Sequence, residues 1–371
     1  MILLNDFVRQ WSEIRQPVLD AVEAVGGSGN YVLGPSVAAF EADLAKLCGA
    51  RHAVGVGNGL DALTIALRAA GCKPGHKVLT TPLSAFATTL AIMQVGAIPC
   101  FVDVDENGLL DLEQIEAVLA RPSTFDFLLP VHLYGRALDL RRLRAIGERS
   151  GIPVIEDCAQ AIGARHGDTL AGTVGRAAAL SFYPTKNLGC IGDGGALLTD
   201  DPDLAERARA LRNYGQSSRY VHDHFGLNSR LDELQARILS GALLPRLAVW
   251  NKRREQIANA YSRGIVNPAL ALPAVTSPGP VWHLFPVLVE HGERASFQAH
   301  LGELGVSSGV HYPKLITEQT ALLAYGKFEI LAPLARAHAF ATREVSLPIH
   351  PYLADSEIDA VVDACNSWSP A

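Results

Sequence analysis

The chain has 371 residues, of which 49% are hydrophobic and 19% are charged, and its formal net charge is −6 at pH 7. This composition excludes a disordered chain and predicts a globular protein long enough for two domains. The acidic balance argues against a nucleic-acid-binding protein, and no apolar run is long enough to span a membrane. The first residues, MILLND, do not have the pattern of a signal peptide. The six cysteines are scattered without a CxxC pair, so we expect reduced thiols in a cytoplasmic protein.

The N-terminal third begins with two predicted helices. Residues 7–24 form the first, which the glycine-rich segment 26–29 closes, and residues 37–47 form the second. A short strand at 52–56 then leads through GVGNGLDAL into another helix, whose free N–H groups could bind a phosphate. A dinucleotide-binding fold uses the same device, but Leu60 stands where its G-x-G-x-x-G motif needs the third glycine. An NAD-binding oxidoreductase therefore stays open as a weakly supported alternative.

Strands and helices alternate through the middle of the chain. Strands are predicted at 78–82, 100–105, 127–131, 154–157 and 177–182, and helical segments connect several of them. This rhythm is typical of parallel strands joined by helical crossovers. We therefore expect an α/β fold, with ligands bound at the carboxyl edge of its sheet.

Two chemically active side chains follow neighbouring strands in this region. The run VIED delivers Asp157 at a strand end, and SFYPTKN carries Lys186 just after the next strand. A lone lysine is usually a solvated surface charge, and an aspartate at a strand end is often only a helix cap. Gln160 one helical turn after the aspartate, and Ser181 before the lysine, weaken that interpretation. The glycines after Lys186 would also let the backbone approach a flat or bulky group. The pattern suits a cofactor held at both ends.

The segments EDCAQAIGA and SFYPTKNLGCIGDGGA carry a specific resemblance. They match the DegT/DnrJ/EryC1/StrS family of sugar aminotransferases almost letter for letter, and the resemblance extends from about Val32 to His350. It implies pyridoxal phosphate as cofactor and an aspartate-aminotransferase-type (fold type I) architecture. In that architecture residues 1–264 form a large domain with a mostly parallel central sheet, ended by a long helix at 239–263. Residues 265–371 form a smaller α+β domain.

The resemblance assigns the chemistry to Lys186 and Asp157. The lysine amine would hold the cofactor aldehyde as a Schiff base and move protons, which desolvation favours by lowering its pKa. The aspartate would keep the pyridine nitrogen protonated and so strengthen the ring as an electron sink. Gln160 is expected to bond the 3-oxygen of the ring or to support Asp157.

The other cofactor contacts also rest on the resemblance. The backbone of Gly59 and Leu60, together with Ser181, would bind the cofactor phosphate. Many relatives have threonine or serine where Leu60 stands, so a hydroxyl contact is absent there. Phe86 would stack on the pyridine ring. Asn228, in the segment GLNSRLDELQA, would reach the phosphate of a neighbouring subunit, which implies a homodimer with shared active sites.

Substrate contacts are expected at Tyr183, His311 and Tyr312, although either of the last two could be structural. His132 is given only a supporting role at its strand end. The pair His222 and His224 resembles a fragment of a metal site, but without a third clustered ligand it is interpreted as a polar loop, and no metal is expected.

The function implied is amino transfer from glutamate to a nucleotide-linked keto sugar. The turn GNGLDAL resembles enzymes that act at C-3 of dTDP-3-keto-6-deoxyhexoses, whereas C-4 enzymes share nearly all other motifs. Three alternatives compete with this function. A related sugar dehydratase would carry histidine in place of Lys186, an oxidoreductase leaves Asp157 and Lys186 unexplained, and a non-catalytic regulator gives no reason for the intact lysine, aspartate and glutamine.

Overall fold

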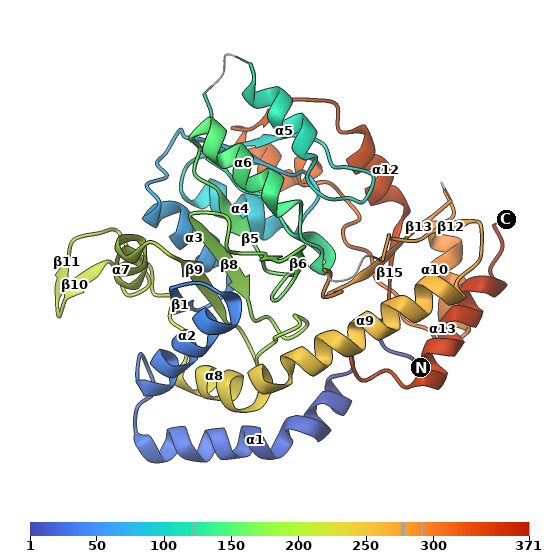
Figure 1. Cartoon of the computed structure of the whole chain (residues 1–371), viewed down its shortest axis with the longest axis horizontal. Helices are drawn as coiled ribbons and strands as arrows, with labels where there is room; N and C mark the ends of the chain where they lie inside the picture. Colours follow the sequence, from blue (N-terminus) through green and yellow to red (C-terminus); the bar gives the residue numbers. More distant parts are fainter. Residues whose placement is uncertain (122–123, 276–278, 291, 371) are drawn as a thin grey trace.

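The computed structural model describes residues 1–121, 124–275, 279–290 and 292–370, and a central sheet runs through its larger part (Figure 1). One four-stranded section has the order β1 (His52–Val56), β9 (Gly195–Thr199), β8 (Ala177–Ser181), β5 (Ile155–Asp157). The other has the order β14 (Glu329–Ile330), β3 (Ile98–Phe101), β2 (Lys77–Thr80), β4 (Phe127–Leu128). Parallel bridges between Leu128 and Val154 and between Val131 and Asp157 join β4 to β5.

Only β9 runs antiparallel to its neighbours, β1 and β8, while the other strand pairs of these two sections are parallel. The expected mostly parallel sheet of an α/β fold is therefore confirmed. Because the parallel strands end at one edge, the segments that follow β5 and β8 leave the sheet side by side.

Helices cover both faces of this sheet and bury two separate apolar clusters. The first cluster lies under α3 (Gly59–Ala69), α4 (Phe86–Gln94), α5 (Leu112–Leu119), α6 (Leu140–Ser150) and α7 (Pro202–Leu211). The second lies under α1 (Phe7–Ser28), α2 (Pro35–Cys48) and α8 (Glu233–Ile238). Because both faces of these strands are buried, their sequences are continuous apolar runs.

A third apolar cluster lies in the C-terminal part of the chain. It packs β12 (Leu270–Ala271), β13 (Phe285–Val289) and β15 (Glu344–Leu347) against α9 (Leu247–Gly264), α10 (Arg294–Glu303) and α13 (Asp355–Ser367). Between these elements, η4 (Ile316–Glu318), α11 (Thr320–Tyr325), β14 and α12 (Ala335–Arg343) return to the large sheet, where β14 pairs with β3. The division of the chain at residue 264 stays a prediction.

Two helix boundaries differ from the sequence-based expectation. Helix α1 continues through Gly26 and Gly27 to Ser28, and only Gly29 adopts the left-handed conformation that ends it. The long helix expected at 239–263 is interrupted: a π-helical turn at Leu239–Leu243 and a 3-10 turn at Leu244–Arg246 precede α9. Pro245 accounts for this interruption because it has no N–H to donate within a helix.

The remaining elements are short. They are η1 (Leu133–Gly135), the hairpin of β6 (Arg165–His166) and β7 (Thr169–Leu170), and the hairpin of β10 (Gln216–Ser218) and β11 (Val221–His222). The β10–β11 hairpin projects from the body of the molecule at the left of Figure 1. Among the described helices, none combines the length and the apolar character needed to cross a bilayer.

Candidate active site

Asp157 lies at the carboxyl end of β5 and is buried, with 5% of its surface exposed. Its Oδ2 accepts a hydrogen bond from the Thr88 hydroxyl at 2.8 Å, and its Oδ1 accepts from the Ala159 N–H at 3.1 Å. Burial raises the pKa of this carboxyl, although these two donors and the nearby Lys186 ammonium favour the ionised form. A buried carboxylate with so few partners retains acceptor capacity for a cationic or N–H group.

Lys186 lies in the turn that follows β8, and its backbone N–H bonds the Tyr183 carbonyl at 2.8 Å. Its amine makes no hydrogen bond or ion pair within the described residues. Burial lowers the pKa of Lys186 to about 8, and the Asp157 carboxylate opposes that shift. The two groups therefore share one electrostatic environment without forming a salt bridge. An amine with this pKa is partly unprotonated near neutral pH, as a nucleophile and proton carrier needs.

The N-terminus of α3 lies directly against the end of β8. Asn58 caps the helix by accepting the Asp61 N–H, while the N–H groups of the first helical residues, Gly59 and Leu60, have no partner within the helix. A Cβ placed on Gly59 would lie 2.7 Å from Cβ of Ser181, so only glycine allows this approach. Free N–H groups, a helix dipole and the Ser181 hydroxyl at one point form a suitable anion site.

Gln160 connects this region to the C-terminal part of the chain. Its Oε1 accepts the Tyr134 N–H at 2.7 Å, and its Nε2 donates to the Tyr312 hydroxyl at 3.2 Å. The Tyr134 hydroxyl in turn donates to the His311 carbonyl at 2.5 Å. The structure thus brings Gln160, Tyr312 and His311 together. The charge of Asp157 acts on the pKa of Tyr312, and the charge of Lys186 acts on the pKa of His311.

Three other predicted site residues are more exposed or lie farther from this network. Phe86 begins α4 and is half-buried against the small cluster around Phe101 and Ile316. Tyr183 is 53% exposed beside the Lys186 turn. Asn228 is exposed next to the base of the β10–β11 hairpin, where its backbone bridges to Asn213. A role for Asn228 toward a neighbouring subunit stays a prediction.

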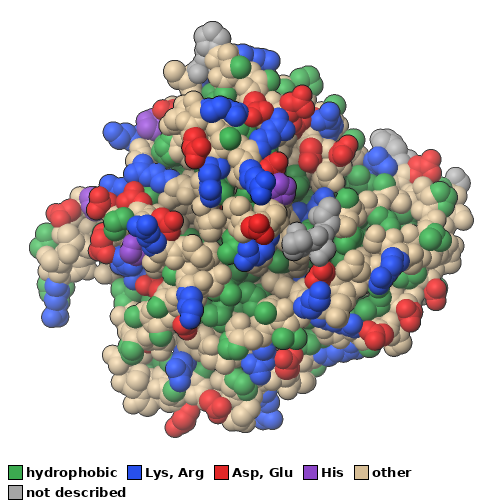
Figure 2. Space-filling view, viewed as in Figure 1, with side chains coloured by type: hydrophobic (Ala, Val, Ile, Leu, Met, Phe, Trp, Pro, Cys, Tyr) green, Lys and Arg blue, Asp and Glu red, His purple; other side chains and the backbone are tan. Residues whose placement is uncertain are grey.

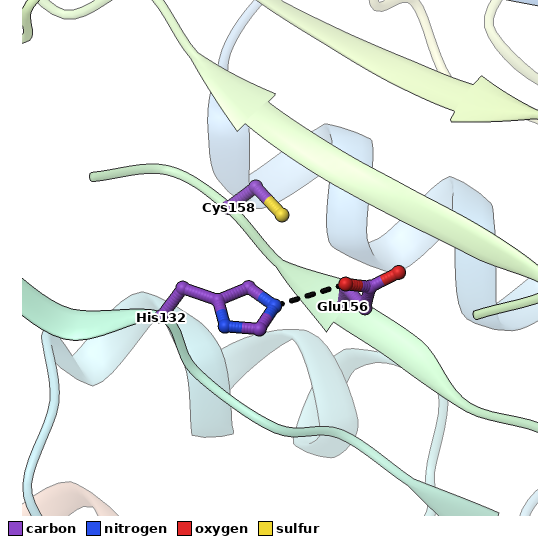
Figure 3. A group of neighbouring side chains, drawn as sticks. All are labelled: His132, Glu156 and Cys158. Atoms are coloured by element: carbon purple, nitrogen blue, oxygen red, sulfur yellow. Dashed lines mark hydrogen bonds and ion pairs between the residues drawn. The ribbon is translucent and has the colours of Figure 1, made fainter. Parts of the chain in front are cut away.

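Glu156, the residue before Asp157, points to the opposite face of β5, where Figure 3 shows it with His132 and Cys158. Its carboxylate accepts from His132 Nε2 at 2.9 Å and from three backbone N–H groups of the segment 172–175. His132 Nδ1 accepts the Leu138 N–H, which leaves the ring proton on Nε2. Burial opposes ionisation of Glu156, but these donors outweigh it and hold the pKa below its usual range.

These three side chains also lie close enough together to suggest a metal site. However, the oxygens of Glu156 are already occupied by four donors, and burial raises the pKa of the Cys158 thiol well above its usual value. A protonated thiol and a saturated carboxylate make poor metal ligands. His222 and His224, the other histidine pair noted in the sequence, lie exposed at the β10–β11 hairpin.

A cavity with a volume of about 740 Å³ lies elsewhere on the surface. Its lining mixes acidic and basic side chains from α5, α6 and the β6–β7 hairpin, and contains none of the predicted site residues. A smaller cavity, of about 20 Å³, borders Lys186 and is also lined by Arg254 and Tyr352. The candidate site is therefore identified by the chemical properties of its side chains and not by the volume of a cavity.

Sequence reasoning missed Thr88, Tyr134, Glu344 and Ser346. Thr88 lies in the first turn of α4, two residues after Phe86, and the adjacent Thr88 and Thr89 in a mostly apolar helix were a weak signal for it. The other three touch the site only through His311 or Gln160, from segments far apart in the chain. No local pattern identifies such contacts.

The arrangement fits pyridoxal phosphate in three respects. An anion site of free N–H groups at α3 suits the phosphate, the buried Asp157 suits a protonated pyridine nitrogen, and the unpaired Lys186 amine suits the aldehyde. Each group is incompletely satisfied by the protein alone, which is the condition expected of side chains that await a partner.

Comparison with known proteins agrees with this fit. The model of the DegT/DnrJ/EryC1/StrS aminotransferase family matches residues 12–366. The chain is 42% identical over 368 residues, covering 98% of this chain and 95% of the relative, to the dTDP-3-amino-3,4,6-trideoxy-alpha-D-glucose transaminase of Streptomyces venezuelae.

Two solved structures extend the comparison. The structure of S. venezuelae DesV in complex with a ketimine intermediate has a TM-score of 0.93, 41% identity, and coverage of 99% of this chain and 98% of that one. NtdA from Bacillus subtilis, with the cofactor PMP bound, has a TM-score of 0.87, 30% identity, and coverage of 94% and 80%. The chain belongs to the DegT/DnrJ/EryC1/StrS aminotransferase family, and it is a sugar aminotransferase that depends on pyridoxal phosphate.

Proposed function

We propose that this enzyme transfers an amino group from glutamate to C-3 of a dTDP-linked 3-keto-6-deoxyhexose. The observation that carries the chemistry is the pair of Asp157, which is buried, and Lys186, which is partly buried. They follow adjacent parallel strands, and the charge of each acts on the pKa of the other. The choice of C-3 is supported by the S. venezuelae relative, whose name states a 3-amino sugar and which matches along nearly its whole length.

Asp157 and Lys186 are assigned different roles at the two ends of the cofactor. Pyridoxal phosphate, when bound, supplies an electron sink that lets an amino group move between two carbon skeletons. Asp157 holds a proton on the ring nitrogen, since a carboxylate in a low-dielectric site strongly favours a cationic partner. Lys186 carries protons between donor and acceptor carbons, for which its pKa of about 8 is well suited. Gln160, held by Tyr134 and Tyr312, is placed to orient the ring oxygen.

The phosphate is assigned to the N-terminus of α3 and Ser181, with backbone donors from Gly59 and Leu60 in place of a side-chain hydroxyl. Phe86 is assigned to the face of the ring. Tyr183, His311 and Tyr312 are assigned to the sugar, since Tyr183 is exposed at the mouth of the Lys186 turn and the other two face the site from the C-terminal part.

We extend the proposal to a homodimer in which Asn228 completes the phosphate site of the neighbouring subunit. Exposed apolar side chains support it: the projecting hairpin and its flanks carry Tyr220 and Phe225, 78% and 87% exposed, and α1 carries Val8, 75% exposed. Figure 2 shows hydrophobic and basic side chains on this hairpin, at the left edge. All six cysteines are buried free thiols, in keeping with a cytoplasmic location.

The decisive experiment follows the two halves of the reaction separately. Glutamate added to the purified holoenzyme should shift the cofactor absorbance, and a dTDP-3-keto-6-deoxyhexose added next should restore it and yield a 3-amino sugar. The matching 4-keto sugar is the control. Amination of the 4-keto sugar alone would overturn the C-3 assignment, and no absorbance change with glutamate would overturn the choice of donor.

A further inference from the structure

A chain of hydrogen bonds connects a fully buried acid, Glu344, to His311. Glu344 begins β15 and has 0% of its surface exposed. Its Oε1 lies 2.5 Å from the Ser346 hydroxyl, which lies 2.9 Å from His311 Nδ1. Its Oε2 accepts the His311 backbone N–H at 2.6 Å. Glu344 therefore holds both the backbone and, through Ser346, the ring of His311.

The main chain around His311 is fixed by further contacts. Ser346 and Gly309 exchange backbone hydrogen bonds of 2.8 and 3.1 Å, and the Tyr134 hydroxyl donates to the His311 carbonyl. With its N–H, its carbonyl and Nδ1 all bonded, His311 has one polar atom, Nε2, that meets no partner among the described residues. Whether that atom donates or accepts depends on which ring nitrogen carries the proton.

The protonation state of Glu344 decides this question. The His311 backbone N–H can only donate, and it bonds Oε2. The proton of a neutral Glu344 therefore lies on Oε1 and is donated to the Ser346 oxygen. Ser346 then donates its own proton to His311 Nδ1, and the ring proton lies on Nε2. If Glu344 is ionised, Ser346 donates to Oε1, Nδ1–H donates to Ser346, and Nε2 becomes a bare acceptor.

We propose that Glu344 and Ser346 are positioning residues that keep His311 as an Nε2–H donor to an oxygen of the keto sugar. The inference rests on the proposed function, because it gives His311 a sugar ligand. When Glu344 loses its proton, each group of the chain passes one proton on: Glu344 to Ser346, Ser346 to Nδ1, and Nε2–H to the site. The net result is one proton delivered to the site and one negative charge left on Glu344.

The electrostatic surroundings agree with the neutral state near pH 7. Burial raises the pKa of Glu344 to about 8, against the hydrogen bonds from Ser346 and His311 and the charge of Arg294 on α10. Burial and the Lys186 ammonium lower the pKa of His311 to about 4, so the ring is neutral. Within the part of the chain that the structure describes, the other titratable groups facing the pair are Tyr134 and Tyr312, whose pKa values are raised, and His283, whose pKa is lowered.

The donor form of His311 is present while Glu344 is protonated and is lost as the pH rises through about 8. Amination of the keto sugar by the aminated holoenzyme should therefore decline on the alkaline side. The glutamate half-reaction, in which no keto sugar takes part, should show no such decline.

The test compares Glu344→Gln, Ser346→Ala and a control, Ser308→Ala, whose hydroxyl accepts only from Gln298 among the described residues. The amide of the Glu344→Gln variant offers an N–H to Ser346 at any pH, so this conservative change should keep sugar amination within about twofold at pH 7 and lose the alkaline decline. Ser346→Ala should lower the rate of sugar amination about tenfold, the loss expected for one hydrogen bond, and leave the glutamate half-reaction unchanged. Ser308→Ala should match the wild type.

Equal losses in Glu344→Gln and Ser346→Ala at pH 7, or an unchanged alkaline decline in Glu344→Gln, would overturn the inference. Nitrogen-15 NMR of the histidine rings in the holoenzyme supplies a readout without sugar, with His311 assigned by its loss in His311→Gln. The proton should lie on Nε2 at pH 7 and move to Nδ1 above about 8 in the wild type only. A wild type that aminates no keto sugar but shows this tautomer change would refute the proposed function and the sugar contact, and leave the Glu344–Ser346 control of His311 standing.

Discussion

Glu156 and Asp157 are adjacent acids on one buried strand, yet their hydrogen bonding and the shifts of their pKa values are opposite. Glu156 meets four donors on one face of the sheet, and its pKa is held below its usual range. Asp157 meets two donors on the other face, and burial raises its pKa. Since successive side chains of a strand point to opposite faces, one residue of separation decides which environment each acid enters.

The difference separates a structural acid from one available for chemistry. A carboxylate whose oxygens are saturated by the protein anchors what surrounds it, in this case the turn 172–175 and His132. A carboxylate left with spare acceptor capacity and a raised pKa is stabilised by whatever cation or N–H group arrives next. Substitutions at Lys186 and at the two acids test that distinction.

Replacing Lys186 by alanine should have the largest effect. It removes the only amine we assign to the cofactor aldehyde and to proton transfer, so turnover should fall by more than about 10³-fold while the fold is kept. The absorbance of bound cofactor should also lose its glutamate-dependent shift. Lys46→Ala, on α2, is the matched control and should behave as the wild type; comparable activity in the two variants would refute the assignment.

Asp157→Asn should reduce turnover by roughly 10²–10³-fold, the usual cost of removing one preorganised electrostatic contact. The free energy of unfolding should change little or rise, because burying the ionised carboxylate of Asp157 destabilises the folded state and asparagine carries no charge. Rates and urea denaturation of the same preparation check both statements. A large loss of stability with normal turnover would place Asp157 in the same structural class as Glu156.

Glu156→Gln should give the reverse result. The glutamine side chain would place its own N–H group against one of the donors that now bond the carboxylate, and two donors cannot bond each other. This change should lower the free energy of unfolding by about 1–3 kcal/mol. Turnover per folded molecule should stay within a few-fold of the wild type, because Glu156 faces away from Lys186. Denaturant titration measures the free energy of unfolding, and the rate per active site measures turnover. A loss of turnover without a loss of stability would contradict the structural role of Glu156.

Gly59→Ala should weaken cofactor binding by about tenfold, corresponding to roughly 1.4 kcal/mol. The new Cβ would lie 2.7 Å from Cβ of Ser181 and would push the start of α3 away from that hydroxyl. Gly27→Ala is the control, since a Cβ there meets nothing within 4 Å and the position is helical. That variant should bind cofactor normally and gain slightly in stability. Titration with pyridoxal phosphate measures both; equal affinities would remove α3 from the phosphate site.

The smallest effect concerns the cofactor-free protein. The pKa of Lys186 is lowered to about 8, so its contribution to stability is complete above its unfolded-state value near 10.5 and is lost as the pH falls through about 8. Lys186→Met should therefore flatten the pH dependence of the melting temperature across that interval. An identical profile in the wild type would show that the amine is not desolvated.

Much of the fold and part of the site could be predicted from local sequence. The alternation of apolar runs with helical segments indicated the mostly parallel sheet, and strand ends indicated where Asp157 and Lys186 would lie, because backbone direction is a local property. The break at Pro245 could have been predicted as well, since a proline four residues or more into a helix leaves a carbonyl without a donor. The contacts of Thr88, Tyr134 and Glu344 could not, since each depends on segments that meet only after folding.

The sequence by itself determined which chemical groups are present and in what order: an acid, an amide, a hydroxyl and an amine, each at or shortly after the end of a strand, with glycine where α3 must approach Ser181. The tertiary structure decided which of those groups remain available. Glu156 is saturated by a turn and a histidine that lie 16 to 24 residues away along the chain, while Asp157 is left for a partner. Desolvation and hydrogen-bond supply depend on the whole surroundings of an atom, and only the folded chain defines those surroundings.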